Sequence, residues 1–448
     1  MGRAHVVAIP YPAQGHVIPM MELAQCLAKN GVRVTFVNTE SNHRRVVEAL
    51  PMQMEELLDL VSVPDGLDCW EDRMDFAKSV EALGRVLPPE LQALIQSINA
   101  TQTDAVTCIV TDVFMAGITQ AYESFRLIKR AAFLPAAAAL LALTTSADKL
   151  VDDGIIDTNG TPLQSEPIRL SPSMPAVNPN HFAWLCLPDL ASRKLIFQSV
   201  VDNNKSAKLA DFLICNSSSA LEPAALGFLG NCRPIGPLLG RQAGHFWPEN
   251  PTCLSWLDRQ PPSSVVYVAF GSFTLLDPVQ FRELALGLEL TGMPFLWVVR
   301  QDVGEAEGPY PDGFEERVRG RGKTVGWAPQ QRVLAHPAVA CFVTHCGWNS
   351  TVESISSGVP VLCWPYFADQ FLNETYVVDE WGVGVRLERD GGGVIGREEI
   401  RRKVEVVLGD GGYKKRMVEL QGKTLATSAE GGSSHANLCD FIDWIKEE

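Results

Sequence analysis

The stretch Trp327–Gln370 reads WAPQQRVLAHPAVACFVTHCGWNSTVESISSGVPVLCWPYFADQ, and its pattern decides the fold of the second half of the chain. The short apolar run at 340–344 has the length and the bounds of a buried strand. The segment HCGWNS at 345–350 follows at once, and apolar residues then recur at a helical spacing. A second apolar run occupies 359–363. We therefore predict a strand, a tight turn, a helix and another strand.

The turn in this stretch has the composition of a phosphate-binding site. Asn349 and Ser350 are residue types that begin helices, so we expect the helix to start here. The first N–H groups of a helix have no partner within it and lie at the positive end of its dipole, which suits an anion. Gly347 lacks a Cβ atom and lets an anion approach the backbone, and His345 adds a side-chain donor. The sequence therefore predicts a phosphate group at this turn.

The same stretch resembles the signature box of the plant secondary-product UDP-glycosyltransferases. In that family the box has 44 residues and runs from a Trp to a Gln or a His, and Trp327–Gln370 also has 44 residues. The rest of the chain is collinear with the family, from the PAQGH segment at 12–16 to the last helix. The resemblance implies an α/β fold of the GT-B type, in which two Rossmann-like doubly wound domains face a cleft. It also implies that the donor substrate is a UDP-sugar and that no metal ion is used.

The length of 448 residues also predicts two large domains. We expect an N-terminal, acceptor-binding Rossmann-like domain at 1–240 and a linker at 241–254, in a region rich in Gly and Pro. A C-terminal, UDP-sugar-binding Rossmann-like domain is expected at 255–430. By resemblance, the segment 431–448 forms a helix that returns to the N-terminal domain.

The first residues predict a β-α-β unit. His5–Ile9 is typical of a parallel strand, a helical stripe of apolar residues follows the loop at 10–16, and the next strand is expected at 32–37. Such a unit belongs to a doubly wound sheet, which binds ligands at the carboxyl ends of its strands. The loop lacks the G-x-G-x-x-G fingerprint of dinucleotide-binding proteins. Further strands are expected at 105–110, 130–133, 212–215, 264–270, 295–299 and 323–325, and helices at 284–290, 397–409, 414–428 and 434–446.

Composition argues against several classes of function. The net charge of −15 argues against nucleic acid or an anionic membrane as a partner. The 11 cysteines contain no C-x-x-C pair, which indicates a reduced protein rather than a disulfide framework or a zinc site. The longest apolar span, Ala131–Leu143, has 13 residues and includes Pro135, so we interpret it as a buried helix rather than a membrane span. We expect a soluble, cytoplasmic monomer without a metal or another cofactor.

Two polar residues are expected at the same edge of the first predicted sheet. His16 lies in the loop after the first strand, and Asp112 lies at the end of the strand at 105–110. A lone His after a Gly is more often a turn or capping residue, but the Asp partner and the PAQGH match favour a catalytic role. We expect His16 to be the general base that takes a proton from an acceptor hydroxyl, and Asp112 to orient its ring. Attack opposite the diphosphate then inverts the anomeric carbon and gives a β-glucoside.

The resemblance also assigns the residues that bind the donor. The expected contacts are Trp327 and Ala328 for the uracil, Gln330 and Glu353 for the ribose, Ser272, His345, Asn349 and Ser350 for the diphosphate, and Trp348, Asp369 and Gln370 for the sugar. Without the family pattern, Trp327 would be interpreted as a core residue and Glu353 as part of a solvated helix face. In the family, Gln at the last position of the box goes with glucose and His with galactose. This favours UDP-glucose here and leaves UDP-xylose and UDP-rhamnose open.

The acceptor site is expected in the first domain. Large apolar side chains near predicted loops are candidates for its wall, although core packing explains each of them equally well: Phe114, Phe133, Phe182, Trp184 and Phe367. Such a wall suits a flat phenolic, flavonoid or terpenoid acceptor. The segment Tyr122–Ile128 departs from the small-residue helix end that is usual in the family, which leaves the local packing open.

Two other functions compete with glycosyl transfer. A non-catalytic UDP-sugar-binding protein would keep the donor residues, but the presence of His16 and Asp112 argues against it. A nicotinamide-dependent oxidoreductase would also use two Rossmann-like domains, but the missing G-x-G-x-x-G argues against it. We therefore predict an inverting UDP-glucosyltransferase that acts on small lipophilic acceptors.

Overall fold

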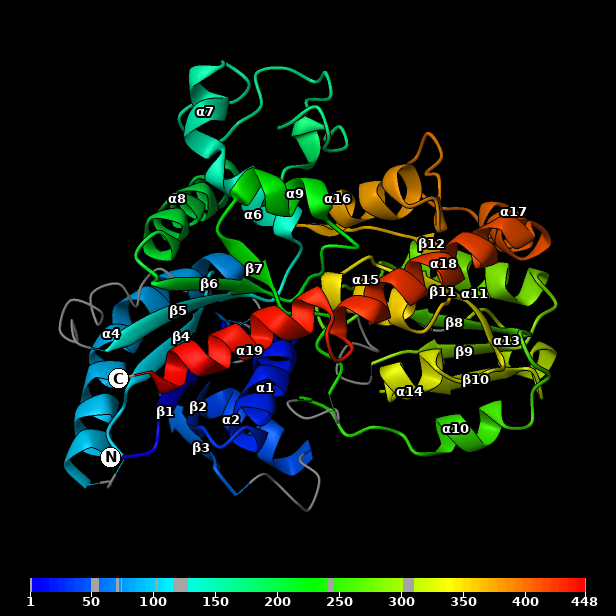
Figure 1. The fold of residues 1–448 in the computed structure, drawn as a ribbon. Coiled ribbons are helices and arrows are strands. Elements are labelled where there is room, and N and C mark those ends of the chain that lie inside the picture. The colour runs from blue at the N-terminus through cyan, green and yellow to red at the C-terminus, as the bar shows by residue number, and fades with distance from the viewer. Residues whose placement is uncertain are drawn as a thin grey trace. The chain divides into compact units, whose positions relative to one another are not determined.

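The structure is a computed structural model that describes residues 2–49, 56–69, 72–73, 75–101, 104–115, 128–240, 245–300 and 310–447. These residues form two compact units (Figure 1). The first unit combines Met1–Phe246 with Thr427–Glu448, and the second unit is Trp247–Ala426. The segment Tyr122–Ile128 lies outside the described residues except for Ile128, and so does the part of the expected linker at 241–244.

A parallel sheet forms the centre of the first unit. In the part of the chain that the structure describes, it has seven strands in the order β3-β2-β1-β4-β5-β6-β7, and all neighbours run parallel. The order reverses between β1 and β4, so the carboxyl ends of these two strands are where a doubly wound sheet binds its ligands. The strands are β1 (His5–Ile9), β2 (Arg33–Thr39), β3 (Leu58–Val63), β4 (Cys108–Asp112), β5 (Lys129–Leu134), β6 (Phe212–Cys215) and β7 (Cys232–Pro234).

Helices connect these strands, because two parallel neighbours need a crossover between them. The first helix, α1, buries Val17, Met20 and Leu27 at helical spacing and therefore packs closely on the sheet. The described helices of this unit are α1 (Gln14–Lys29), α2 (Glu40–Ala49), α4 (Phe76–Thr101), α6 (Ala138–Thr145), α7 (Ala147–Asp152), α8 (Leu190–Ala207), α9 (Pro223–Leu229) and α19 (Ser433–Lys446), with short 3-10 turns at Pro179–His181 and Ala183–Leu185.

The second unit repeats this plan. Its sheet has six described strands in the order β10-β9-β8-β11-β12-β13, and again all neighbours run parallel. The strands are β8 (Val265–Ala269), β9 (Phe295–Val298), β10 (Gly322–Val325), β11 (Val339–Thr344), β12 (Val361–Cys363) and β13 (Gly384–Arg386). The helices are α10 (Thr252–Leu257), α11 (Pro278–Leu290), α13 (Phe314–Arg317), α14 (Gln330–Leu334), α15 (Trp348–Ser356), α16 (Gln370–Thr375), α17 (Arg397–Gly409) and α18 (Gly411–Ser428), with a π-helical turn at Tyr376–Glu380.

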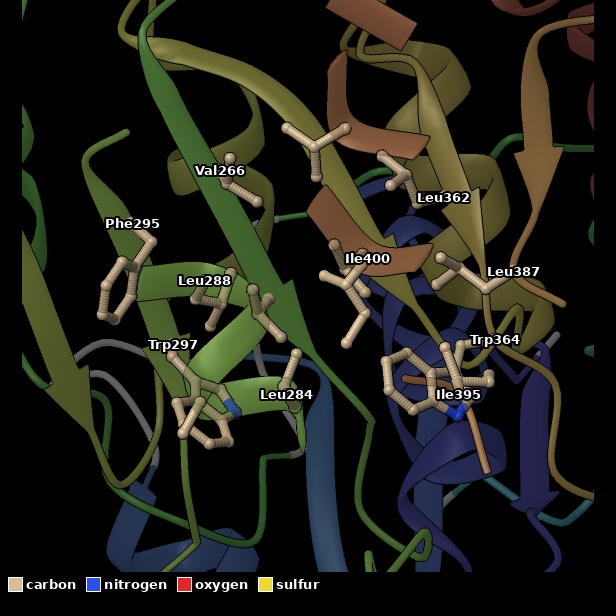
Figure 2. Close-up of a cluster of buried hydrophobic side chains, with 14 of the residues drawn as sticks. Val266, Leu284, Leu288, Phe295, Trp297, Leu362, Trp364, Leu387, Ile395 and Ile400 are labelled. Carbon is tan, nitrogen blue, oxygen red and sulfur yellow. The ribbon is translucent and has the colours of Figure 1, made fainter. Parts of the chain in front are cut away.

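Both faces of the second sheet are buried. Along β8, Val266 and Val268 belong to one apolar cluster, whereas Val265, Tyr267 and Ala269 belong to another. Figure 2 shows the first cluster, in which side chains of α11 and α17 pack with side chains of β8, β9 and β12. A strand that is covered on both faces has a nearly continuous apolar sequence, which is why the strand at 264–270 was predictable.

Two predicted elements of the first unit differ from the structure. The apolar span Ala131–Leu143 is not one buried helix. Its first part is the strand expected at 130–133, which is β5 and ends at Leu134, and α6 begins only at Ala138. Both parts are buried, so the apolar run continues across Pro135 and does not separate strand from helix. The strand expected at 105–110 begins and ends later, and Asp112 is its last residue.

Three strands were missed, and all three lie at the edge of a sheet. They are β3, β7 and β13. β3 reads LDLVSV and mixes polar with apolar residues, while β7 and β13 have only three residues each. An edge strand has one neighbour and less buried surface, so its sequence carries a weaker apolar pattern than that of a central strand.

The last helix, α19, packs on the first sheet. Asn437 Nδ2 donates a hydrogen bond of 2.8 Å to the carbonyl of Pro234 in β7. The neighbouring Arg233 forms an ion pair of 3.1 Å with Asp440. The rings of Phe441 and Phe212 lie 5.2 Å apart. These contacts make α19 part of the first unit.

Candidate active site

His16 and Asp112 meet at the carboxyl edge of the first sheet. His16 lies in the first turn of α1, directly after β1, and Asp112 ends the neighbouring strand β4. His16 Nδ1 lies 2.7 Å from Asp112 Oδ2. A carboxylate only accepts hydrogen bonds, so Nδ1 carries the proton and Nε2 is left as the acceptor. The pair therefore holds an imidazole in the tautomer that can take up a proton.

The carboxylate of Asp112 is fixed by the backbone around it. The N–H of Phe114 donates to Oδ1 at 3.0 Å, and the N–H of Tyr11 donates to Oδ2 at 3.4 Å. The rings of Tyr11 and Phe114 also lie 5.2 and 5.3 Å from the ring of His16. Backbone N–H groups therefore fix the carboxylate of Asp112, and two aromatic rings pack against the imidazole of His16.

A small hollow adjoins this pair. It is lined by Val113, Phe114, Leu134, Leu141, Thr144, Val200, Asn203 and Ala207. Its volume of about 10 Å³ has room for about one water molecule. The lining is apolar except for Thr144 and Asn203, and Phe114 links it to His16. As it stands, the hollow has room for only a small part of an organic acceptor.

The five residues predicted for the acceptor wall have different surroundings within their units. Of these, Phe114 lines the described hollow. Phe133 is fully buried in β5. Phe182 and Trp184 are also buried, with their rings 4.8 Å apart. Phe367 lies in the second unit, where its ring is 6.3 Å from that of Phe273.

In the second unit, the turn after β11 opens a helix as expected, but the helix starts earlier. Helix α15 begins at Trp348 and its N-cap residue is Gly347. Asn349 and Ser350 are therefore in the first turn of the helix rather than before it, at the positive end of its dipole. Cys346 adopts a left-handed conformation with φ of 64°, which turns the chain sharply from strand to helix.

His345 packs between two glycines. A Cβ atom at Gly271 would lie 2.6 Å from His345 Nε2, and one at Gly347 would lie 2.5 Å from it. Neither position therefore has space for a side chain while the imidazole is in place. Burial, with a smaller effect of the Arg300 charge, lowers the pKa of His345 to about 4. The ring is neutral near pH 7 and can act as a hydrogen-bond donor without a charge.

The two residues expected at the ribose are bonded to each other. Gln330 Nε2 donates to Glu353 Oε2 at 2.7 Å and to Ser350 Oγ at 2.9 Å. Tyr267 donates to Gln330 Oε1 at 3.2 Å, and Gln331 Nε2 donates to Glu353 at 3.2 Å. Burial raises the pKa of the Glu353 carboxyl. The structure thus brings a carboxylate, an amide and a hydroxyl of α14 and α15 together.

Trp327 lies just before α14 and has an aromatic neighbour. Its ring is stacked on Trp247, with the centroids 4.9 Å apart and the planes at 30°. The Nε1 atom of Trp327 is buried and has no hydrogen-bond partner among the described residues. Ala328, the next residue, is 4% exposed. A flat ring with an unused donor suits a planar, polar ligand.

The end of the signature box is tied to the turn that precedes α15. Asn373 Nδ2 donates to Cys346 O and to Asp369 Oδ2, both at 2.9 Å. Gln370 Oε1 accepts hydrogen bonds from the N–H groups of Tyr366 and Phe367 at 2.7 and 3.1 Å. The backbone therefore already occupies the side-chain oxygen of Gln370. Its amide nitrogen is the group that is left for a ligand.

Comparisons with known proteins decide the family. The family described as UDP-glucoronosyl and UDP-glucosyl transferase matches residues 239–423. UDP-glycosyltransferase 83A1 of Arabidopsis thaliana is 43% identical over 465 aligned residues, which cover 100% of this chain and 98% of that protein. The chain belongs to the plant UDP-glycosyltransferase family. Another relative, 7-deoxyloganetin glucosyltransferase of Catharanthus roseus, is 32% identical, and the alignment covers 100% of this chain and 97% of that protein.

This UDP-glycosyltransferase also has the fold of solved relatives. The structure of Phytolacca americana UGT2, complexed with UDP-2fluoro-glucose and pterostilbene, matches with a TM-score of 0.83 and 27% identity over 99% of each chain. The predicted GT-B class, with two Rossmann-like parallel sheets, is confirmed. The predicted enzyme class is confirmed as well, because the relatives are glycosyltransferases that use UDP-sugars.

The described part of this UDP-glycosyltransferase contains neither a group of metal-ligand side chains nor a helix that could span a membrane. In the described parts of the chain, no three or more His, Cys, Asp or Glu residues are grouped so that they could hold a metal ion. No helix there is both long enough and apolar enough to cross a membrane.

Three residues of this UDP-glycosyltransferase that the sequence did not single out interact with the stretch Trp327–Gln370: Trp247, Arg300 and Asn373. The local sequence could have indicated Asn373, because this residue follows Asp369 by four positions and therefore lies on the same face of a helix. Trp247 comes from the expected linker, and Arg300 follows β9. Nothing in their local sequence points to the box, so only the folded chain brings them to it.

Proposed function

We propose that this glycosyltransferase transfers glucose from UDP-glucose to a hydroxyl group of a small lipophilic acceptor, a phenolic, flavonoid or terpenoid compound, with inversion at the anomeric carbon. The observation that carries the proposal is the 2.7 Å hydrogen bond between His16 and Asp112, next to an apolar hollow. The first unit would bind the acceptor and the second unit the donor.

The proposed step moves one proton and one glycosyl group. The acceptor oxygen attacks the anomeric carbon from the face opposite the diphosphate, and its proton passes to His16 Nε2. The bond between the anomeric carbon and the diphosphate oxygen breaks, and its electron pair leaves with UDP. Asp112 stabilises the imidazolium that forms. The product of this step from an α-linked donor is a β-glucoside.

The proposed donor contacts follow the sequence assignment. Trp327 stacks on the uracil, which the unused Nε1 atom and the partial exposure of the residue support. Glu353 and Gln330 bind the ribose hydroxyls, and their present hydrogen bond to each other shows that both reach one point. The start of α15, His345 and Ser272 bind the diphosphate, and hydrogen bonds to a leaving group strengthen as its charge develops. Because these groups supply hydrogen bonds to the diphosphate, we propose that the reaction needs no added metal ion.

The sugar would lie against Trp348, Asp369 and Gln370. Asp369 is held by Asn373, so its carboxylate has a fixed position from which to accept bonds from sugar hydroxyls. The amide nitrogen of Gln370 would donate to another hydroxyl, since its oxygen is bonded to the backbone. A fixed hydrogen-bond acceptor beside a fixed hydrogen-bond donor favours one hexose over its epimers, because the epimers place a hydroxyl differently.

The acceptor class is inferred from the hollow beside His16 and from relatives. The described lining is mostly apolar, which favours a lipophilic compound. One relative is named a 7-deoxyloganetin glucosyltransferase, and one solved relative holds pterostilbene. We propose that the enzyme acts as a cytoplasmic monomer, in keeping with its negative net charge and its lack of a C-x-x-C pair.

A mass-spectrometric screen tests the proposed function. Purified protein is incubated with UDP-glucose and a panel of phenols, flavonoids and terpenoid alcohols, without added metal. We expect a product heavier than its acceptor by one hexose residue, and we expect the variant His16→Ala to lose it. His435→Ala, a histidine change on α19 of the same unit, is the control. Tight UDP binding without product from any UDP-sugar would instead support a binding protein.

A further inference from the structure

The proposed donor residues leave the charge of the diphosphate unbalanced. Of these residues only His345, Glu353 and Asp369 have ionisable side chains. The imidazole of His345 is neutral near pH 7, because burial and the Arg300 charge lower its pKa to about 4. The start of α15 contributes roughly half a positive charge. A side-chain cation in this place would therefore add to the stabilisation that the neutral donors give to a diphosphate.

Arg300 is a cation at the matching edge of the second sheet. It follows β9, so it lies at the carboxyl edge, where β8 leads into Gly271 and Ser272 and β11 leads into His345. Its side chain is turned inward, and the residue is 5% exposed. A charge so well buried is expensive unless the surroundings use it.

Two contacts and one electrostatic effect place the guanidinium near the proposed donor residues. Nη2 donates to the carbonyl of Thr274 at 3.4 Å, in the same loop as Ser272. The guanidinium carbon lies 5.9 Å from the ring centroid of Trp247, whose ring is stacked on Trp327. The Arg300 charge also acts on the imidazole of His345. Arg300 is thus linked to the uracil end and to the diphosphate end of the proposed site.

We propose that Arg300 binds the diphosphate of the UDP-sugar and stabilises the negative charge on UDP as the glycosidic bond breaks. This rests on the proposed function. The planar guanidinium presents several N–H donors in a fixed geometry that fits phosphate oxygens. As the bond to the anomeric carbon breaks, the electron pair moves to the phosphate oxygen, and the interaction with Arg300 strengthens.

The competing explanation is that Arg300 only holds the loop at Thr274 in place. Two variants separate the two roles. Arg300→Gln removes the charge but keeps an amide that can donate to the Thr274 carbonyl, whereas Arg300→Lys keeps the charge. Arg321→Met is the matched control, because Arg321 also donates to backbone carbonyls, of Glu289 and Met293, but precedes β10 at the opposite edge of the sheet.

The test compares binding of UDP and of uridine by calorimetry, with thermal melting as a check of folding. We expect Arg300→Gln to weaken UDP about 10- to 100-fold and to leave uridine nearly unchanged. Arg300→Lys should keep part of the UDP affinity, and Arg321→Met should bind both ligands as the parent protein does. The turnover of Arg300→Gln at saturating donor should fall as well.

The outcomes separate this inference from the proposed function. Equal weakening of UDP and uridine by Arg300→Gln would assign Arg300 a purely structural role, and an unchanged UDP affinity would exclude a diphosphate contact. Either result overturns the inference. If Arg300→Gln is unfolded in the melting check, Arg300→Lys decides by the same comparison. A fall in its UDP-to-uridine affinity ratio relative to the parent protein supports the diphosphate contact, and an unchanged ratio overturns it. Failure of the parent protein to bind UDP would instead overturn the proposed function.

Discussion

The imidazole of His16 and the carboxylate of Asp112 are joined by a 2.7 Å hydrogen bond across 96 residues of sequence. The side chain of Asp112 has no exposed surface, whereas that of His16 is 24% exposed. The carboxylate therefore faces only protein, while the ring can still reach a substrate. This asymmetry is what a general base and its orienting partner require.

Replacing His16 by Ala should lower turnover by about 10²–10⁴-fold, because the acceptor hydroxyl would lose its base. UDP affinity should stay the same, since the proposed donor residues all belong to the second unit. Steady-state kinetics with the acceptor found in the screen, together with UDP calorimetry, measures both quantities. Turnover close to that of the parent protein would remove His16 from the mechanism.

Asp112→Asn should lower turnover by about 10²–10⁴-fold, because it would change the tautomer of His16. The amide oxygen would accept from the Phe114 N–H, as Oδ1 does now, and the NH₂ group would then face His16 Nδ1. The imidazole proton would be forced onto Nε2, so the base would be lost. The double variant with His16→Ala should be no slower than His16→Ala alone, because the two residues act as a unit. Multiplying effects in the double variant would contradict this.

Gly347→Ala should weaken UDP binding strongly, because its Cβ would lie 2.5 Å from His345 Nε2 and displace the ring. Gly396→Ala is the matched control. Both glycines are N-cap residues with negative φ, −59° and −75°, but a Cβ at Gly396 meets nothing within 4 Å. Calorimetry should show weaker UDP binding only for Gly347→Ala. Similar affinities in the two variants would show that His345 does not contribute to UDP binding.

Trp327→Ala should weaken UDP and uridine alike, by about 1–3 kcal/mol, which is the typical contribution of stacking on a nucleobase. Trp327→Phe keeps a ring and should retain most of the affinity. Because the uracil is common to both ligands, the ratio of their affinities should not change, in contrast to the expectation for Arg300→Gln. A loss that affects UDP but not uridine would place Trp327 away from the base.

The protonation of His345 should make the protein less stable in acid. Its pKa in the folded protein is lowered to about 4 from 6.5, so the unfolded chain binds more protons between these two values. The free energy of unfolding therefore falls as pH drops from about 6.5 to about 4, at up to about 1.4 kcal/mol per pH unit. Above this window His345 contributes no pH dependence. Denaturant unfolding of His345→Gln should show a shallower fall over this window, and parallel curves for the two proteins would refute the prediction.

Much of the fold was predictable because central parallel strands are apolar along their whole length. Val265–Ala269 and Val339–Thr344 are buried on both faces, and their sequences show it. The edge strands β3 and β13 were not predicted, since a strand with one neighbour has a weaker pattern. The span Ala131–Leu143 was misread because strand and helix are equally buried on either side of Pro135.

The sequence by itself determined the family, the two parallel sheets and the turn that starts α15, because these depend on residue types at fixed local spacing. It also placed His16 and Asp112 at one sheet edge, since parallel strands end on the same side. Only the tertiary structure decided which side chains meet. The ring of His345 fits between Gly271 and Gly347, Asn373 ties Asp369 to Cys346, and Arg300 reaches Thr274 and Trp247. Such contacts depend on side-chain packing between distant segments, and no local spacing encodes them.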